Sequence, residues 1–244
     1  MQAAGFPRPA TALPLTAHQP NYLPWLGLFH RVAQSDVWVL ADDVPFSKHG
    51  YTNRVRVRTA AGWQWLTVPV RTRGRRGQQI RQVETCGGNW QSKHWRTLEW
   101  NYRGSFHFDD FAPFLASFFE ERRWDLLVDV NVALCDFLRR QLGIEVETRL
   151  SSSLQLRRAR SERLVDMALA CGCDVYLAGG GGSRRYLEES CFAEAGVELR
   201  FVDFEHPEYP QCFPGFEANM TALDLLFNCG AEYAGRMMES ATGC

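Results

Sequence analysis

The chain has 244 residues, and its 27 lysine and arginine residues nearly balance its 28 aspartate and glutamate residues. This balance provides no overall positive charge to attract nucleic acid or an anionic membrane. The sequence also contains no run of about 18 apolar residues, the pattern that predicts a transmembrane helix. With 45% hydrophobic residues, the composition is typical of a globular protein. Residues 1–10 lack the apolar segment of a signal peptide, so we expect a flexible leader, one domain over residues 11–244 and a cytoplasmic location.

The first predicted elements form a strand, a polar turn, a helix and a second strand. The apolar run 12–17 predicts a strand, the amphipathic segment 26–33 a helix, and the β-branched and aromatic segment 36–43 the second strand. His18 follows the first strand, and the second strand ends in two aspartates. Because open parallel sheets bind ligands at the carboxyl ends of their strands, we expect these polar residues to share one site.

A β-hairpin is predicted next. Residues 44–54 contain proline and glycine and predict a loop, after which the alternating segment 55–59 and the aromatic segment 63–70 predict two antiparallel strands. The segment 71–77 carries four arginines and two glycines. This pattern is typical of an exposed loop, and it would also suit a lid over a phosphate-bearing substrate. Residues 80–85 predict a further short strand.

The middle of the chain is predicted to be mainly helical. In its first helix, Trp95, Leu98 and Tyr102 have the spacing of one apolar helix face. The predicted helices are 89–102, 111–119 and 124–142, followed by a strand at 144–150 and a helix at 162–171. The first three helices define a helical subregion of about residues 89–142.

A second crossover unit follows. It consists of a predicted strand at 174–178, the glycine loop Gly179–Ser183, a helix at 184–195 and a strand at 197–202, with helices at 220–228 and beyond 231 completing the chain. Glycines let a ligand approach the backbone, and a helix start offers N–H donors, although a tight connection would explain the same loop. We predict an α/β fold with a mostly parallel Rossmann-like sheet flanked by helices, a small antiparallel β-hairpin insertion and the helical subregion.

The candidate site combines residues that follow strands with residues of nearby loops. His18, Asp42 and His94 are the candidate catalytic residues, because imidazole or carboxylate groups can take a proton and imidazole can stabilise an oxyanion. The candidate substrate-binding residues are Gln19, Asn21, Tyr22, Asp43, Lys48, Asn53, Arg54, Lys93, Tyr102, Gly180, Gly181, Ser183 and Tyr209. Two alternatives stay open: His18 and the two aspartates could ligate Mg²⁺, or the aspartates could belong to a solvated turn.

Many of these residues belong to segments that match a known pattern. The segments are His18–Gly27, Asp36–Phe46, Asn53–Arg54, Trp65–Val70, Trp90–His94, Tyr102, Tyr176–Gly179, Tyr186–Leu187, Tyr209, Gln211 and Asp224–Gly230. Over about residues 15 to 232 the chain resembles the WbqC-like family of bacterial proteins. Members of this family resemble accessory enzymes of surface-polysaccharide, amino-sugar and natural-product assembly. The chain departs from the family pattern at Pro45, where a polar residue such as glutamine is expected.

The resemblance implies an enzyme that modifies an amine or a sugar. We expect a biosynthetic transferase that joins an activated acyl or aminoacyl group to an amine of an amino sugar or natural-product intermediate. Its donor would be a nucleotide, a CoA or pantetheine thioester or an aminoacyl donor. Its partner would be a carrier protein or an aminoacyl-tRNA. Whether the chain forms a homodimer stays open.

Three other functions compete with this expectation. One is a nucleotide-dependent ligase or nucleotidylyltransferase, although the HxGH pattern of the latter is absent from the corresponding segment Tyr22–Trp25. Another is a non-catalytic sugar- or carrier-binding partner. The third is a hydrolase that uses one of the eight cysteines as a nucleophile.

Overall fold

The computed structural model describes residues 12–241. The leader expected at residues 1–10 therefore lies outside the described residues, as do residues 11 and 242–244. Within the described range, no helix is long and apolar enough to cross a membrane.

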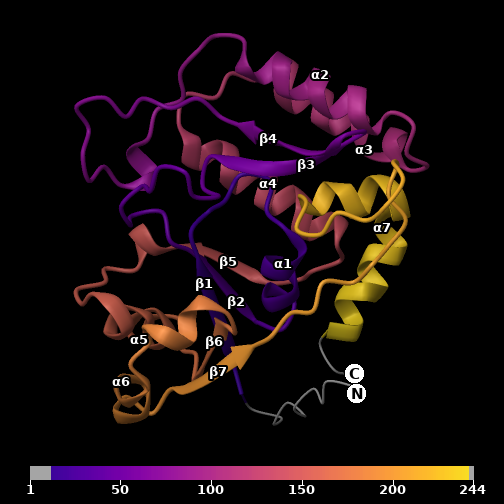
Figure 1. Cartoon of the computed structure of the whole chain (residues 1–244). Helices are drawn as coiled ribbons and strands as arrows, with labels where there is room; N and C mark the ends of the chain where they lie inside the picture. Colours follow the sequence, from indigo (N-terminus) through magenta and orange to yellow (C-terminus); the bar gives the residue numbers. More distant parts are fainter. Residues whose placement is uncertain (1–11, 242–244) are drawn as a thin grey trace.

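A five-stranded parallel sheet forms the centre of the fold (Figure 1). Its strands are β1 (Pro14–His18), β2 (Val37–Leu40), β5 (Glu147–Leu150), β6 (Val175–Gly179) and β7 (Glu198–Val202). Their order across the sheet is β5-β2-β1-β6-β7, and each neighbouring pair is parallel. The chain thus runs outward from β1 to one edge, returns, and runs to the other edge from β6. This is the Rossmann-like order, with its topological switch point between β1 and β6, and the predicted fold class is confirmed.

Helices cover both faces of the sheet. One face packs against α1 (Leu26–Val32), α4 (Leu127–Gln141) and α7 (Ala222–Ala241), and the other against α5 (Arg160–Ala170) and α6 (Glu189–Glu194). The alternation of side chains along β2 divides its residues between the two cores. Trp38 and Leu40 belong to the first core, and Val37 and Val39 to the second.

The insertion between β2 and β5 lies above the sheet in Figure 1. It contains the antiparallel hairpin of β3 (Arg54–Thr59) and β4 (Gly62–Thr67), followed by α2 (Trp90–Tyr102) and α3 (Phe108–Ala116), which a π-helical turn at Ser117–Glu121 extends. The hairpin and the helical character of this region are as predicted. Its apolar side chains join the core on the α1 face of the sheet.

Two predicted elements are wrong. The strand expected at 80–85 is a 3₁₀ turn at Ile80–Gln82, flanked by single bridge pairs of Glu84 and Thr85 with other segments. The helix expected at 184–195 is split into a 3₁₀ turn at Gly182–Arg185 and α6. Between them, the main-chain N–H of Glu188 donates to the Ser161 hydroxyl of α5 at 3.0 Å. A tertiary contact thus provides the hydrogen bond that helical continuation would have supplied.

Helix α7 is kinked at Gly230, which has φ 78° and ψ 168°. Only glycine adopts this conformation without strain, and a Cβ there would lie 2.7 Å from Cε1 of His107. We expect Gly230→Ala to lower the free energy of unfolding by about 2 kcal/mol, measured by urea denaturation.

Gly235, further along the same helix, provides a matched control. A Cβ at Gly235 has its nearest neighbour, the main-chain oxygen of Leu142, at 3.9 Å, an ordinary contact. Gly235→Ala should therefore stabilise the protein by about 0.5 kcal/mol through helix propensity. Equal effects of the two substitutions would contradict the assigned kink.

Candidate functional site

A cavity of about 770 Å³ lies at the switch point of the sheet. Its lining includes the carboxyl ends of β1 and β6, the glycine loop and the start of α5. The polar residues that line it are His18, Gln19, Arg31, Arg160, Ser161, Arg163, Tyr176, Ser183, Tyr186 and Glu188. The two crossover units therefore deliver polar residues to one cavity, the position at which open α/β sheets bind ligands.

His18 ends β1 and is partly exposed in this cavity. Its Nδ1 lies 2.9 Å from the main-chain oxygen of Gln19, and because a carbonyl only accepts, Nδ1 carries the proton. Nε2 then holds a lone pair and has no hydrogen-bond partner in the described part of the chain. Burial and the neighbouring charge of Arg31 lower the pKa of His18 to about 4. The ring is therefore neutral at pH 7, with one nitrogen able to accept a proton.

The turn that follows His18 is fixed by contacts from two other segments, α4 and the loop before β3. Asn131 of α4 donates to the main-chain oxygens of Pro20 and Thr52, each at 2.7 Å. The Thr52 hydroxyl donates to the side-chain oxygen of Gln19 at 3.1 Å. Asn21 is buried in the same turn, and its main-chain oxygen lies 3.6 Å from the thiol of Cys135. These contacts hold His18 and Gln19 in place before any ligand arrives.

Arg31 reaches the cavity from the last turn of α1. Within the described range its guanidinium makes no hydrogen bond or ion pair, and its Nε is buried. Burial lowers the pKa of Arg31, whereas the nearby hydroxyls of Tyr176 and Tyr186 raise it. The guanidinium passes close to Gly179, where a Cβ would lie 2.6 Å from Nη1.

The two adjacent aspartates after β2 have different surroundings. Asp43 forms an ion pair of 2.6 Å with Arg163 of α5 and accepts a short hydrogen bond from Ser151. Burial alone would raise the pKa of Asp43, but these hydrogen bonds and the charge of Arg163 lower it below its usual range. Asp43 thus contacts the switch-point cavity through Arg163.

Asp42 lies in a separate place. It lines a second cavity of about 620 Å³, which is mainly apolar and is bounded by α4, β2 and β5. Its carboxylate accepts hydrogen bonds from the main-chain N–H and hydroxyl of Ser152, at 2.9 and 2.7 Å. Asp42 is buried and holds the turn after β5, and it does not line the cavity of His18. Among residues 12–241, no three His, Cys, Asp or Glu side chains are grouped to hold a metal ion.

The glycine loop contributes Ser183 to the cavity, and the Ser183 hydroxyl lies 3.1 Å from that of Tyr186. Gly180 is placed by its main-chain N–H, which donates to Val202 at 2.8 Å, and a Cβ there would collide with Asp203. Gly181 is exposed and has no atom near its Cβ position. Gly180 therefore has a structural reason to be glycine.

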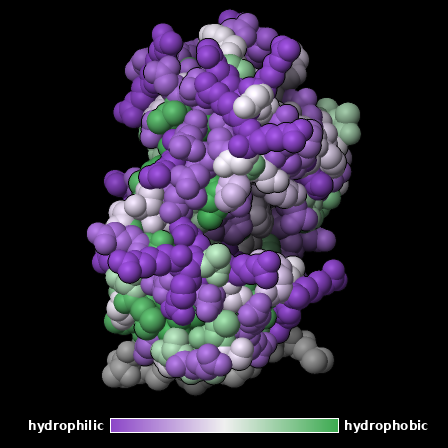
Figure 2. All heavy atoms as spheres, turned by 90° about the vertical axis from the view of Figure 1, so that its left-hand side faces the viewer, coloured by the Kyte–Doolittle hydropathy of each residue, from purple (hydrophilic) through white to green (hydrophobic). Residues whose placement is uncertain are grey.

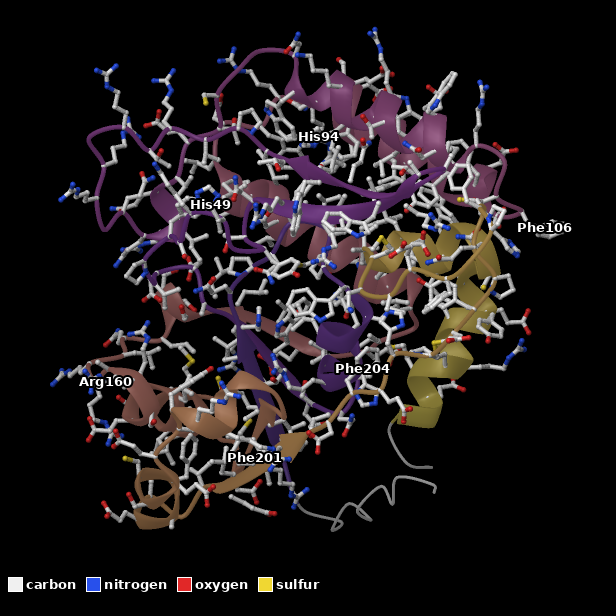
Figure 3. All side chains as sticks on the ribbon, in the orientation of Figure 1. His49, His94, Phe106, Arg160, Phe201 and Phe204 are labelled. Carbon is white, nitrogen blue, oxygen red and sulfur yellow. The ribbon has the colours of Figure 1, made fainter. Side chains whose placement is uncertain are left out.

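His94 lies elsewhere, between α2 and the hairpin (Figure 3). Figure 3 shows His94 in the upper part of the molecule, away from Arg160 at the lower left. Its Nε2 donates to the main-chain oxygen of Thr67 at 3.1 Å, so its Nδ1 accepts from the Tyr22 hydroxyl at 2.7 Å. Both side chains are buried, and the pair joins the first turn of the chain to α2.

The buried imidazole of His94 predicts a loss of stability in mild acid. Burial lowers the pKa of His94 to about 4, well below that of an unfolded histidine. Between these two values the unfolded state binds more protons, so stability falls as the pH decreases from about 6.5 towards about 4. From about pH 7 to about pH 5 this histidine should account for a loss of about 2 kcal/mol.

Urea denaturation of the wild type and of His94→Asn at both pH values tests this prediction. The asparagine variant should be less stable at neutral pH but should lose less stability on acidification. An equal loss in both proteins would mean that His94 is not held neutral. His18, His30 and His206 also have lowered pKa values, so part of the pH dependence should remain.

Four further candidate residues lie on the hairpin and its surroundings. The Asn53 amide is buried and donates to the main-chain oxygen of Val68 at 2.9 Å. The Arg54 guanidinium stacks 4.1 Å from the centre of the Trp65 ring and donates to the main-chain oxygen of His49. Lys48 and Lys93 are exposed. None of these residues lines the cavity of His18.

Tyr102 belongs to a buried polar network around Asp224, whereas the buried hydroxyl of Tyr209 has no hydrogen-bond partner among the described residues. The Tyr102 hydroxyl donates to Asp224 at 2.9 Å and accepts the main-chain N–H of Arg58 at 2.8 Å. Tyr209 is buried, with its ring 6.2 Å from that of His206. The network joins α2, the hairpin and α7, and it accounts for Tyr102 as a structural residue.

Sequence reasoning missed the three arginines of the cavity. Arg31 lies on a short helix with no local pattern that marks it. Arg160 and Arg163 belong to a segment with four arginines between residues 157 and 163, and this charge run at the start of a helix is a signal in the sequence. The denser charge run at 71–77 forms an exposed loop that does not line the cavity of His18, and in it Arg71 and Arg75 pair with Glu84 at 3.5 and 2.7 Å.

The side of the molecule that carries Arg160 and His49, at the left in Figure 3, faces the viewer in Figure 2. Hydrophilic residues dominate this side.

Burial raises the pKa of the Cys135 thiol and raises that of Cys173 to about 11. These two thiols are therefore protonated at neutral pH.

Comparisons with known proteins identify a protein family whose sequence model matches most of the chain. The sequence model of the WbqC-like protein family matches residues 19–235, a range that starts one residue after His18 and includes Arg31, Gly179 and Arg163. The Uncharacterized protein Rv1507c of Mycobacterium tuberculosis (strain ATCC 25618 / H37Rv) is 35% identical over 215 residues, which are 88% of this chain and 93% of that protein. No solved structure matches the chain.

Proposed function

The chain belongs to the WbqC-like protein family, and on this basis we propose that it is a small-molecule biosynthetic transferase. It would join an activated acyl or aminoacyl group to the amine of an amino sugar or natural-product intermediate. Support comes from the neutral His18 at the switch-point cavity, whose Nδ1 is held by Gln19 at 2.9 Å. A fixed tautomer with a free lone pair is what a general base requires.

The proposed step is the formation of an amide. The amine nitrogen attacks the carbonyl carbon of a thioester or aminoacyl ester donor, and Nε2 of His18 takes the proton that the amine loses. The new C–N bond forms as the C–S or C–O bond to the donor breaks. The imidazolium then returns its proton to the departing thiolate or alkoxide, so His18 ends neutral as it began.

A genetic and metabolic experiment tests this function with the substrate still unidentified. Cells that lack the gene should accumulate an amine, and they should lose a product that is heavier by one acyl or aminoacyl group, as measured by untargeted mass spectrometry. Expression of the wild-type chain should restore the product. Unchanged metabolites, or a difference that does not correspond to acyl transfer, would refute the transferase function.

The order of the sheet also favours a second function, nucleotide-dependent ligation. The order β5-β2-β1-β6-β7 is that of Rossmann-like nucleotide-binding folds. A ligase would consume ATP in proportion to product, whereas the transferase would form product from a preformed thioester or ester without ATP. Measurement of ADP or AMP release during turnover therefore separates the two. Binding of substrates without turnover would instead favour a non-catalytic binding partner.

A further inference from the structure

The switch-point cavity has more basic than acidic residues in its lining. Arg31, Arg160 and Arg163 line it together with a single acidic residue, Glu188. Arg163 is paired with Asp43. Within residues 12–241 the guanidinium groups of Arg31 and Arg160 have no acidic partner. This excess of positive charge favours the binding of an anion.

Arg31 is placed at a cost to the empty protein. Its Nε is buried without a hydrogen bond, although such groups normally have partners in folded proteins. A charge that loses water and gains no partner destabilises the folded state. An anion in the cavity would supply the missing hydrogen-bond acceptors.

The first turn of α5 faces the same cavity through Arg160, Ser161 and Arg163. Ala159 precedes this helix of 11 residues and provides no side-chain cap. The amide groups of the first turn therefore lack a side-chain acceptor and can donate to an anion. Arg160 has φ 54°, a left-handed conformation that is uncommon for arginine and that concentrates at ligand sites.

We propose that this cavity binds a phosphate group of the donor or acceptor, through the guanidinium of Arg31 and the first turn of α5 with Arg160. The proposal rests on the transferase function above and specifies the chemistry of one of its substrates. A phosphate group offers more acceptor oxygens and more charge than a carboxylate, so it can engage two guanidinium groups and the helix start together. Nucleotides and CoA share this group.

Gly179 offers a way to move Arg31 without removing its charge. A Cβ at Gly179 would lie 2.6 Å from Nη1 of Arg31, so Gly179→Ala should displace the guanidinium. Gly182, in the same loop, has no atom within 4 Å of its Cβ position, and Gly182→Ala is the matched control. For Arg31→Gln the control is Arg185→Gln, because Arg185 is exposed and does not line the cavity.

Isothermal titration calorimetry on the full chain with inorganic phosphate, ADP, CoA and acetate tests the proposal. The wild type should bind at least one phosphate ligand and should bind acetate much more weakly. Arg31→Gln should weaken phosphate binding by about ten- to a hundredfold, Gly179→Ala should weaken it in the same direction, and both controls should bind as the wild type does. Tighter binding of CoA than of ADP would assign the phosphate group to a thioester donor. Equal binding of CoA and ADP would assign it to a nucleotide.

The melting temperature distinguishes a ligand-binding from a structural role of Arg31. If Arg31 serves to bind a ligand and does not stabilise the empty protein, Arg31→Gln should leave the melting temperature of the empty protein unchanged or raise it. Wild-type binding to none of the phosphate ligands, acetate binding as tight as theirs, or undiminished binding by Arg31→Gln would each overturn the proposal.

The measured binding of phosphate does not depend on turnover. His18→Asn should retain phosphate binding. A failure of the transferase function with Arg31-dependent binding intact would therefore leave the phosphate site standing.

Discussion

Replacement of His18 by asparagine should lower turnover by about two to four orders of magnitude, the usual contribution of a general base. The asparagine side chain can retain the donor to the main-chain oxygen of Gln19 that Nδ1 provides at 2.9 Å, but it removes the lone pair of Nε2. Folding should therefore be preserved while proton transfer is lost. Production of the heavier metabolite by the complemented strain, and the far-UV and thermal profiles of the purified variant, measure the two effects.

His49→Asn is the matched control for this substitution. His49 is exposed, lies outside the cavity and has φ 67°, a conformation that asparagine tolerates well. This variant should keep full activity. Full activity in His18→Asn as well, with the fold intact, would remove His18 from the mechanism.

The pH dependence of the same reaction gives a further check on His18. Burial and Arg31 lower the pKa of His18 to about 4 in the empty protein, so the base is already deprotonated at neutral pH. We therefore expect that protonation of His18 causes no decrease in kcat/KM between about pH 7 and about pH 5. A bound phosphate would offset the charge of Arg31, and the pKa of His18 that controls kcat should be higher than the one that controls kcat/KM.

Asp224→Ala should lower the free energy of unfolding by about 3–5 kcal/mol, because it leaves buried donors without an acceptor. Asp224 is fully buried, and burial raises the pKa of its carboxyl group while hydrogen bonds from its neighbours lower it. The Tyr102 hydroxyl donates to one carboxylate oxygen at 2.9 Å, and the Gln211 amide donates to the other at 2.7 Å. The Gln211 side-chain oxygen in turn accepts from Arg58 at 3.2 Å.

Asp224→Asn keeps one acceptor oxygen and should cost less than the alanine variant. Its amide would face the amide of Gln211, which cannot rotate without losing its contacts to Arg58 and Glu217. Asp109→Ala is the control, since Asp109 is exposed on α3, and it should cost less than about 1 kcal/mol. Urea denaturation measures all three. A loss below about 1 kcal/mol in Asp224→Ala would mean that the network does not hold the helices together.

Two separate sets of buried hydrogen bonds, the Tyr22–His94 pair and the network around Asp224, explain why several residues of the family pattern do not line the cavity. Tyr22, His94, Tyr102 and Asp224 all belong to segments that carry the family resemblance, yet they form buried hydrogen bonds that join α2 and α7 to the rest of the fold. Buried polar groups need partners as strictly as ligands do. A recognisable polar residue is therefore as compatible with a structural role as with a catalytic one.

The sequence by itself determined the strands of both sheets, most of the helices and the edge of the parallel sheet that carries the switch-point cavity, although it also predicted a strand at 80–85 where the structure has a 3₁₀ turn. The alternation along β3 and the helical spacing in α2 are local patterns, because each is set by the geometry of one element. The parallel order followed from two crossover units, and it placed His18 and Ser183 in one cavity.

Only the tertiary structure decided which polar residues share that cavity. Arg31 from α1 and Arg163 from α5 meet there because the two helices cover opposite faces of the sheet and both reach its edge. Asp42 and Asp43 are neighbours in sequence, yet Ser152 holds one and Arg163 the other. Local sequence patterns carry no information about such partners, since hydrogen bonds and ion pairs between distant segments depend on how whole elements pack.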